Sequence, residues 1–245
     1  MELANKLEGR VAVVTGASSG IGRAISVALS RQGARLCLIG RNPLTLAETA
    51  VAARRFSEVK EFQIDLTVEG KLDPLVRYIE RETGRVDILI HSAGIVQMGT
   101  MAQAHLQDLD LQYATNVRAP YMLTQRLLSF LTACRGQIVF INSSAGVTAN
   151  RPDIGQYAAT KHALKAMADS LRDEINPLGV RVLTMYLGRT ATPMQEALYR
   201  QGGKSYHPEA LLQPEDVAST VVQSLMLTAT AEITDISIRP MSKSY

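Results

Sequence analysis

The chain contains no tryptophan, only two cysteines, and no apolar run long enough to cross a lipid bilayer. A membrane-spanning helix needs about 18 consecutive apolar residues, so no transmembrane segment and no membrane partner are expected. Two thiols, Cys37 and Cys134, are too few for the disulfide framework of a small secreted domain and fit the reducing conditions of the cytoplasm. Residues 1–6 are too polar for a signal peptide, which also predicts a cytoplasmic protein.

Clustered metal ligands and a large excess of one charge are missing as well. The four histidines and two cysteines show no paired ligand spacing, and therefore no metal site is predicted. The 26 basic and 23 acidic residues give a net charge of +3, and the basic side chains are scattered along the chain. This pattern argues against a nucleic-acid partner, while a small positive excess suits an anionic small molecule.

Regular alternation of strand and helix patterns is the main feature that the sequence does show. With 245 residues, 46% of them hydrophobic, and no linker-like stretch, the chain is expected to form one domain over residues 1–245. The alternation predicts an α/β fold, with a Rossmann-type, doubly wound parallel sheet of about seven strands and helices on both faces. The predicted strands are 11–15, 35–39, 59–64, 86–90, 137–141, 181–185 and 233–238.

A glycine-rich loop follows the first predicted strand and leads into an amphipathic helix. Its spacing is Gly16-x-x-x-Gly20-x-Gly22. Gly16 allows a tight turn, Gly20 leaves room for a diphosphate near the backbone, and Gly22 lets the helix pack against the strand. Free N–H groups at the helix start would then face the phosphates. The loop therefore predicts a dinucleotide site formed by Gly16, Ser18, Ser19, Gly20, Ile21 and Gly22.

The end of the second predicted strand indicates which dinucleotide is bound. An acidic residue is usual there when the ribose carries a free 2′-hydroxyl, but this chain has Gly40 followed by Arg41. The planar guanidinium of Arg41 suits a 2′-phosphate, so NADP(H) is predicted in preference to NAD(H). A solvated loop arginine without a role in binding is the alternative.

Tyr157 and Lys161 are the most informative pair for the chemistry. They lie four residues apart in a helical pattern (residues 158–175), so their side chains share one face. A cation beside a phenol favours the phenolate and lowers the phenol pKa toward the working range of a proton donor. A proton donor of this kind is what carbonyl reduction, or alcohol oxidation in reverse, needs near neutral pH.

The segment Thr15 to Gly22, together with Tyr157-x-x-x-Lys161, resembles the short-chain dehydrogenase/reductase family over nearly the whole chain, from about residue 7 to 239. The resemblance implies hydride transfer between a nicotinamide and a carbonyl or secondary alcohol, with Tyr157 as the general acid/base. Ser144 is assigned to the substrate oxygen because it precedes Tyr157 by 13 residues, as in the family, and Ser143 to a lining role. The implied catalytic residues are Asn116, Ser144, Tyr157 and Lys161.

The resemblance also implies cofactor contacts and shows three departures from the family pattern. Asp65 is implied to face the adenine, although it could instead cap the next turn. His91 and Ser92 replace the usual asparagines after the fourth strand, and Leu187 replaces the usual proline; we interpret His91 as a structural hydrogen-bonder. The further implied cofactor contacts are Leu66, Ala93, Gly94, Tyr157, Lys161, Gly188 and Thr192.

Residues 189–211 are predicted to form a substrate lid with a paired-glycine hinge, and an ordinary surface loop is the alternative. The substrate is expected to be a small to medium, weakly polar carbonyl or alcohol, and the protein a homodimer or homotetramer. Two other functions stay open. One is an epimerase or dehydratase on the same fold, and the other is a non-catalytic NADP(H)-sensing protein.

Overall fold

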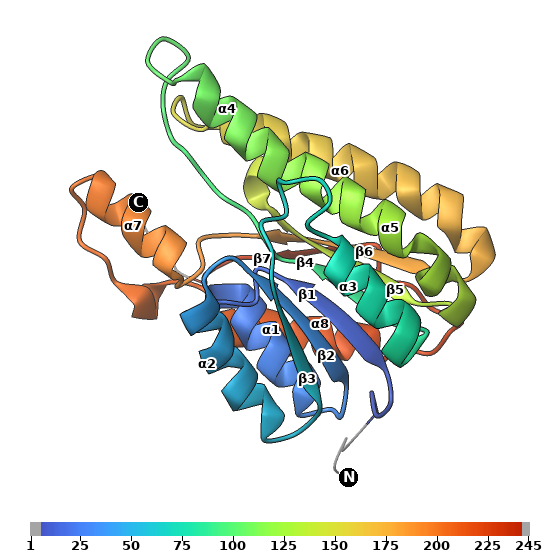
Figure 1. Cartoon of the computed structure of the whole chain (residues 1–245). Helices are drawn as coiled ribbons and strands as arrows, with labels where there is room; N and C mark the ends of the chain where they lie inside the picture. Colours follow the sequence, from blue (N-terminus) through green and yellow to red (C-terminus); the bar gives the residue numbers. More distant parts are fainter. Residues whose placement is uncertain (1–5, 242–245) are drawn as a thin grey trace.

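Seven parallel strands form the centre of the molecule, in the order β3-β2-β1-β4-β5-β6-β7 (Figure 1). The computed structural model describes residues 6–241. This arrangement confirms the predicted doubly wound α/β sheet. The strands are β1 (Val11–Thr15), β2 (Arg35–Gly40), β3 (Val59–Gln63), β4 (Ile88–His91), β5 (Gln137–Ser143), β6 (Arg181–Leu187) and β7 (Asp235–Ile238).

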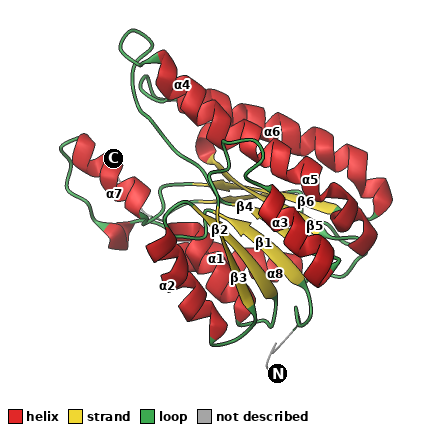
Figure 2. Ribbon diagram, viewed as in Figure 1, coloured by secondary structure: helices red, strands yellow, loops and turns green. Residues whose placement is uncertain are grey.

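Helices cover both faces of the sheet, as Figure 2 shows. One face carries α1, α2 and α8, and the other carries α3, α5 and α6, with α4 leading into α5 (Figure 1). The helices are α1 (Gly20–Ser30), α2 (Pro43–Arg54), α3 (Asp73–Tyr78), α4 (Leu106–Tyr113), α5 (Ala119–Cys134), α6 (Gly155–Ile175), α7 (Pro193–Gln201) and α8 (Pro214–Leu225).

The strand β1 illustrates why the sheet is buried on both sides. All five of its residues are buried, and they alternate between the two cores. Ala12 and Val14 pack toward α1 and α8, whereas Val11 and Val13 pack toward α5 and α6. Because side chains of a strand alternate between faces, a continuous apolar run of this kind needs cover on both faces, and the helices supply it.

Local signals in the sequence set several element boundaries. The Asn42 side chain accepts hydrogen bonds from the N–H groups of Leu44 (3.0 Å) and Thr45 (3.3 Å) and so forms the N-cap of α2. Pro43 occupies the first turn, where its missing N–H costs nothing. Strands β5 and β6 each continue two residues beyond their predicted ends, to Ser143 and Leu187. This extension carries both residues to the edge where the candidate site lies.

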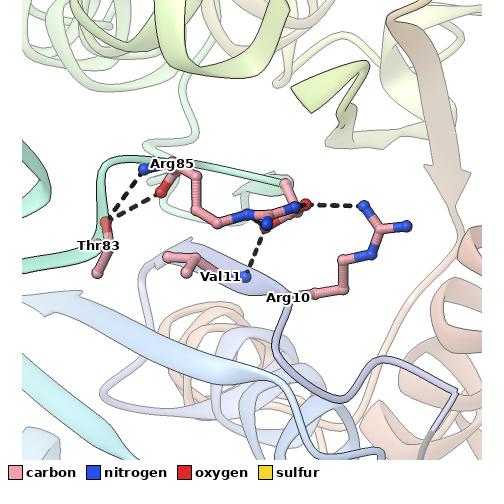
Figure 3. A network of polar contacts seen from close by, with 5 residues as sticks. Arg10, Val11, Thr83 and Arg85 are labelled. Carbon is pink, nitrogen blue, oxygen red and sulfur yellow. Dashed lines mark hydrogen bonds and ion pairs between the residues drawn. The ribbon is translucent and has the colours of Figure 1, made fainter. Parts of the chain in front are cut away.

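A buried ion pair joins the opposite edge of the sheet, at the amino ends of the strands. The Asp87 side chain is 2% exposed and accepts hydrogen bonds from Arg10 Nη1 (2.8 Å) and Arg85 Nη2 (2.6 Å). The backbone N–H of Val11 adds a further hydrogen bond of 2.9 Å to the same carboxylate. Figure 3 shows Arg10 and Arg85 converging beside Val11. The carboxylate therefore ties the start of β1 to the segment that precedes β4.

Candidate active site

A cavity of about 360 Å³ opens at the carboxyl ends of β4, β5 and β6. Helices α6 and α7 both contribute to its lining, α6 with Tyr157 and Lys161 and α7 with Met194, Gln195 and Leu198. Parallel strands of a doubly wound sheet place their ligand sites at this edge. The structure therefore brings together at one cavity many of the residues that the sequence singled out. Those in the lining are Ile21, Gly94, Ser143, Ser144, Tyr157, Lys161, Leu187, Gly188 and Thr192.

Tyr157 lies in the first turn of α6, and the hydroxyl of Ser143 is near enough to lower the pKa of its phenol. Ser143 is the last residue of β5, whereas Ser144 begins a short 3₁₀ turn and is more exposed. The sequence assigned the substrate oxygen to Ser144 from its spacing to Tyr157. Both serines line the cavity, and Ser143 is the one that influences the Tyr157 phenol, because β5 extends far enough to carry its side chain there.

Lys161 lies one helical turn after Tyr157 and is buried. Its Nζ donates to the carbonyl oxygen of Ile141 at 3.2 Å and lies 5.8 Å from the centroid of the Tyr157 ring. Burial lowers the pKa of Lys161 to about 8, because the charged ammonium loses its hydration.

Burial also decides the protonation of Tyr157. It raises the pKa of the phenol above the ordinary value near 10, and the Ser143 hydroxyl works against this rise. The four-residue spacing predicted that Lys161 lowers the pKa of Tyr157. In the structure burial instead raises the pKa of Tyr157, so Tyr157 holds its proton at neutral pH.

Asn116 lies in a π-helical turn, Ala114–Arg118, that joins α4 to α5. Its side chain is buried and fully engaged. Oδ1 accepts from the N–H of Ile95 (2.9 Å), while Nδ2 donates to the carbonyl oxygen of Ile95 (2.9 Å) and to Thr160 Oγ1 (3.0 Å). Asn116 thus fixes the segment after β4 against α6, next to the residue that precedes Lys161.

The glycine loop packs against the segment after β4 so closely that side chains are excluded. Gly16 has φ of +65°, and a Cβ there would lie 2.8 Å from the Cα of Ala93. A Cβ on Gly94 would lie 3.4 Å from Asn116 Oδ1 and 3.7 Å from Lys161 Nζ. At Gly22 a Cβ would strike the carbonyl of Gly16. The three glycines thus leave an open cradle of backbone between β1 and β4.

Ser18 contributes an unsatisfied polar group at the same loop. Its hydroxyl is buried and has no hydrogen-bond partner among the described residues. It lies against Gly40 at the end of β2, where a Cβ would collide with it. A buried hydroxyl without a partner costs free energy unless a ligand supplies one. The orphaned hydroxyl and the backbone cradle both fit a phosphorylated dinucleotide.

Arg41 and Asp65 follow β2 and β3 at the same edge. Arg41 is exposed at the surface. The Asp65 carboxylate accepts from Thr67 Oγ1 (2.7 Å) and from the N–H of Thr67 (3.0 Å), which makes it the cap of the next turn. These two hydrogen bonds are the main reason that the pKa of Asp65 is lowered, and the nearby charge of Arg41 contributes less. The adjacent Leu66 is buried.

Two polar residues that the sequence analysis did not single out brace the site. Thr15 Oγ1 accepts from the N–H groups of Ser92 (3.0 Å) and Ala93 (3.0 Å). Asn142 Nδ2 donates to the carbonyl oxygen of Lys161 at 3.1 Å. In the sequence, Thr15 and Asn142 could have been recognised as polar residues near the ends of otherwise apolar strands. Thr15 joins β1 to the segment after β4, and Asn142 joins β5 to α6.

His91 belongs to the core and not to the cavity. Its ring stacks on Phe140 with centroids 4.8 Å apart, and its Nε2 lies 2.8 Å from Thr124 Oγ1. Burial lowers the pKa of His91 to about 3, so the imidazole is neutral at physiological pH. These contacts agree with the interpretation of His91 as a structural hydrogen-bonder.

The chain after β6 leads into the predicted lid. The N–H of Gly188 donates to the carbonyl oxygen of Ile238 at 2.7 Å, and Pro240 packs against the same glycine. Thr192 caps α7 by accepting from the N–H of Gln195 at 3.2 Å. Its methyl group would lie 3.0 Å from a Cβ on Gly20. The turn at Gly188, where Leu187 replaces the proline usual in the family, is therefore held by contacts with β7 and with the residues that follow it.

The lid leaves the sheet and returns to it at a single point. Thr190 and Leu212 form an isolated parallel bridge, in which the N–H of Leu212 donates to the carbonyl oxygen of Arg189 at 3.1 Å. The N–H of Ala191 donates back to Leu212 at 2.8 Å. Six residues in the first half of the predicted lid line the cavity: Arg189, Thr190, Thr192, Met194, Gln195 and Leu198.

Residues 6–241 contain neither a membrane-spanning helix nor a cluster of metal ligands. No helix there is both long and apolar enough to span a bilayer. The same residues contain no group of three or more metal-ligating side chains.

Comparison with known proteins identifies the family. The family model for short chain dehydrogenases matches residues 10–202. An uncharacterized oxidoreductase of Staphylococcus epidermidis is 31% identical over 237 residues, which cover 96% of this chain and 99% of that protein. A metagenomic short-chain oxidoreductase solved in complex with NADP has a TM-score of 0.81 at 27% identity, over 96% of this chain and 99% of that one.

A second solved structure is an alcohol dehydrogenase from the archaeon Thermococcus sibiricus, complexed with 5-hydroxy-NADP. It has a TM-score of 0.85 at 25% identity and covers 96% of this chain and 99% of its own. The chain belongs to the short-chain dehydrogenase/reductase family of oxidoreductases.

Proposed function

We propose that the protein is an NADP(H)-dependent oxidoreductase that interconverts a carbonyl and a secondary alcohol, with Tyr157 as the general acid/base. The observation that carries the proposal is that Tyr157, Lys161 and the two serines Ser143 and Ser144 line one cavity, in which burial keeps the Tyr157 phenol protonated. When bound, NADP(H) supplies a hydride, with its electron pair, to the carbonyl carbon or accepts one from the alcohol carbon. The chain's own residues handle the proton that accompanies it.

Each polar side chain then has a separate role at the reacting oxygen. Ser143 donates a hydrogen bond to the carbonyl oxygen and stabilises the negative charge that develops there. Tyr157 transfers its proton to this oxygen, and the proton together with the hydride delivered to carbon converts the carbonyl into the alcohol. Lys161 returns a proton toward Tyr157 and contacts the nicotinamide ribose. Asn116 holds the segment that borders Lys161 and keeps this proton path organised. The resemblance to the family is the support for the roles of Lys161 and Asn116.

The cofactor is proposed to lie along the carboxyl edge from β2 to β6. The loop of Gly16, Ser19, Gly20, Ile21 and Gly22 would hold the diphosphate, and the orphaned hydroxyl of Ser18 would gain a partner there. The adenine would meet Asp65 and Leu66. Ala93, Gly94, Gly188 and Thr192 would border the nicotinamide half. Two similar proteins of known structure are complexed with NADP or a hydroxylated NADP, which supports this cofactor.

The preference for NADP(H) rests on Arg41, and replacing this residue tests it. We expect Arg41→Gln to weaken NADPH binding about tenfold, because one charge-assisted contact with the 2′-phosphate is lost. NADH has no 2′-phosphate, so its affinity should hardly change. Fluorescence titration of both variants with both cofactors measures the difference. Arg23→Gln, which removes an exposed arginine paired with Glu48, is the control. Equal losses for NADPH and NADH would contradict the role of Arg41.

Two other functions compete with this proposal. An epimerase or dehydratase on the same fold would use the cofactor transiently and consume none. A cofactor-sensing protein would bind NADPH without turnover, but the Tyr157 and Ser143 hydroxyls in one cavity have no purpose in such a protein. Net oxidation of NADPH by a panel of carbonyl compounds distinguishes the oxidoreductase from both alternatives.

We also propose that the protein is a homo-oligomer in the cytoplasm, in which α5 and α6 of one copy pack against those of another. A groove of about 280 Å³ lies between these two helices, and its lining mixes the apolar side chains of Leu128, Met167 and Leu171 with polar ones that include Gln125 and Glu174. Tyr121 on the same face is 55% exposed. Exposed apolar side chains that cluster between two helices favour a protein partner. Sedimentation velocity should give the mass of a dimer or tetramer, and a monomer at micromolar concentration would contradict this.

A further inference from the structure

Two buried side-chain amides, about one helical turn apart, connect the cavity wall to α6. Gln112 lies in the last turn of α4, and Asn116 follows it by four residues, so both side chains lie on the same side. Both are almost completely buried. A polar side chain is tolerated in a core where hydrogen bonds compensate for its lost hydration. Asn116 has such partners in Ile95 and Thr160, and Gln112 has a parallel set.

The hydrogen bonds of Gln112 have a defined direction. Its Oε1 accepts from the backbone N–H of Gln97 at 3.0 Å, and its Nε2 donates to Gln156 Oε1 at 3.3 Å. Gln156 Nε2 in turn donates to the carbonyl oxygen of His105, which precedes α4, at 3.1 Å. A backbone N–H can only donate and a carbonyl oxygen can only accept, so the two ends fix the orientation of both amides. Flipping either amide would break this chain of three hydrogen bonds.

The backbone that Gln112 holds is part of the cavity wall. Gln97 lies between Val96 and Met98, both of which line the cavity. Residues 92–100 belong to no helix or strand, so individual hydrogen bonds from neighbouring elements decide where this segment lies. Figure 1 shows α4 beside α6, and the segment leads from β4 toward the start of α4. The bond from the Gln97 N–H therefore fixes the wall against α4.

The other end of the hydrogen-bond chain reaches the catalytic turn of α6. Gln156 directly precedes Tyr157, and Thr160, which is bonded by the second amide, directly precedes Lys161. Each amide thus bonds the residue before one of the two functional side chains. The separation between the cavity wall and the Tyr157 phenol therefore depends on Gln112, although Gln112 itself is not among the residues that line the cavity.

We propose that Gln112 is a positioning residue for the reaction. By joining Gln97 to Gln156, it sets the distance between the cavity wall and Tyr157 and thereby the place of a substrate carbonyl against the phenol. The inference rests on the proposed oxidoreductase function and deepens it. A misplacement of about 1 Å can cost on the order of a hundredfold in rate when reacting groups must be held in line, so a residue outside the cavity can have a large effect.

Replacing Gln112 with methionine tests the proposal, because methionine keeps the length and helix propensity of glutamine and makes neither hydrogen bond. Kinetics are measured at saturating NADPH with ethyl acetoacetate, cyclohexanone and benzaldehyde as carbonyl probes. We expect kcat/KM to fall about tenfold or more, mainly through kcat, while the dissociation constant for NADPH stays within about threefold of the native value. Native kcat/KM in Gln112→Met, or an equal loss of NADPH affinity, would overturn the proposal.

A control variant and a double-mutant cycle separate positioning from a general loosening of the core. Gln107→Met changes an exposed glutamine of the same helix and should retain the native kcat/KM. Gln156→Met breaks the bond to Gln112 from its partly buried end. The double variant should lose little more activity than Gln112→Met alone, because residues that share one interaction are not additive. Losses that multiply would contradict action through Gln156.

Failure of Gln112→Met to fold would not end the test. Gln156→Met then decides, since its side chain is only partly buried and the Gln97 bond remains. A fall in kcat of about threefold or more, with native NADPH affinity, would support the proposal. Native activity in Gln156→Met would overturn it.

The inference and the proposed function fail in different ways. Turnover that Gln112→Met leaves unchanged would overturn the positioning role and leave the oxidoreductase intact. If no carbonyl compound oxidises NADPH, the proposed function fails, and backbone hydrogen exchange decides the inference. The Gln97 N–H should exchange at least about tenfold faster in Gln112→Met, and residues 155–161 should also exchange faster. Unchanged exchange in residues 155–161 would overturn the link between the wall and α6.

Discussion

Replacing Tyr157 with phenylalanine is expected to reduce carbonyl reduction by about a thousandfold or more, because the substrate oxygen loses its proton donor. The change removes one oxygen atom and leaves the ring in α6. The dissociation constant for NADPH should therefore remain within about threefold of the native value, which corresponds to a change of roughly 0.7 kcal/mol or less in the binding free energy. Stopped-flow or steady-state NADPH oxidation gives the rate, and fluorescence titration gives the affinity. Full turnover by Tyr157→Phe would remove Tyr157 from the mechanism.

The two neighbouring serines provide a matched control for that experiment. Ser143→Ala removes the hydroxyl that lowers the pKa of Tyr157, and we expect kcat to fall by about a hundredfold. Ser144→Ala removes an otherwise identical hydroxyl one residue later, from a 3₁₀ turn, and should cause a clearly smaller loss. The reverse order of effects would restore the assignment that sequence spacing gave to Ser144.

Replacing Asp87 with asparagine is expected to lower the free energy of unfolding by about 3 kcal/mol, because charged hydrogen bonds to a buried group are lost. The carboxylate serves Arg10, Arg85 and the N–H of Val11 at once. Urea denaturation followed by circular dichroism measures the change. Asp73→Asn is the control, since Asp73 and its partner Arg126 are both more than 40% exposed. An exposed pair of this kind contributes about 1 kcal/mol or less.

The contribution of the Asp87 carboxylate to the free energy of unfolding is also expected to depend on pH. Burial alone would raise the pKa of Asp87, but hydrogen bonds from Arg85, Val11 and Arg10 outweigh it and lower the pKa below the ordinary value. Its contribution is therefore complete at pH values above about 4 and disappears as the pH falls through the lowered pKa. The stability difference between native protein and Asp87→Asn should be constant from pH 6 to 8 and shrink in acid. A difference that grows in acid would contradict this.

The fold could be predicted from the sequence largely because its strands are buried on both faces. A continuous apolar run such as residues 11–15 marks a covered strand without knowledge of its neighbours, and the glycine loop after it has one structural explanation. Element ends were less well determined. The extra residues of β5 carry Ser143 into the site, and a spacing rule alone selects Ser144. Where a strand ends depends on pairing with the next strand, which local sequence does not reveal.

Electrostatics at the site could not be read from residue spacing. Tyr157 and Lys161 share a helix face as predicted, but how far each is buried depends on the whole fold. Burial reverses the expected direction for the Tyr157 pKa and lowers that of Lys161 to about 8. Likewise, Thr15 finds its partners in Ser92 and Ala93, more than 70 residues later in the chain.

The bridge between Thr190 and Leu212 has a consequence for how this enzyme could change its substrate range. The chain departs and returns at adjacent backbone positions, so the 21 residues between them form a cassette whose length does not affect the sheet. Insertions or replacements there would leave Ser143, Tyr157 and Lys161 in position, because these residues lie on β5 and α6. Apart from Thr192, which is proposed to border the cofactor, the segment can vary in sequence without moving the side chains that perform the chemistry.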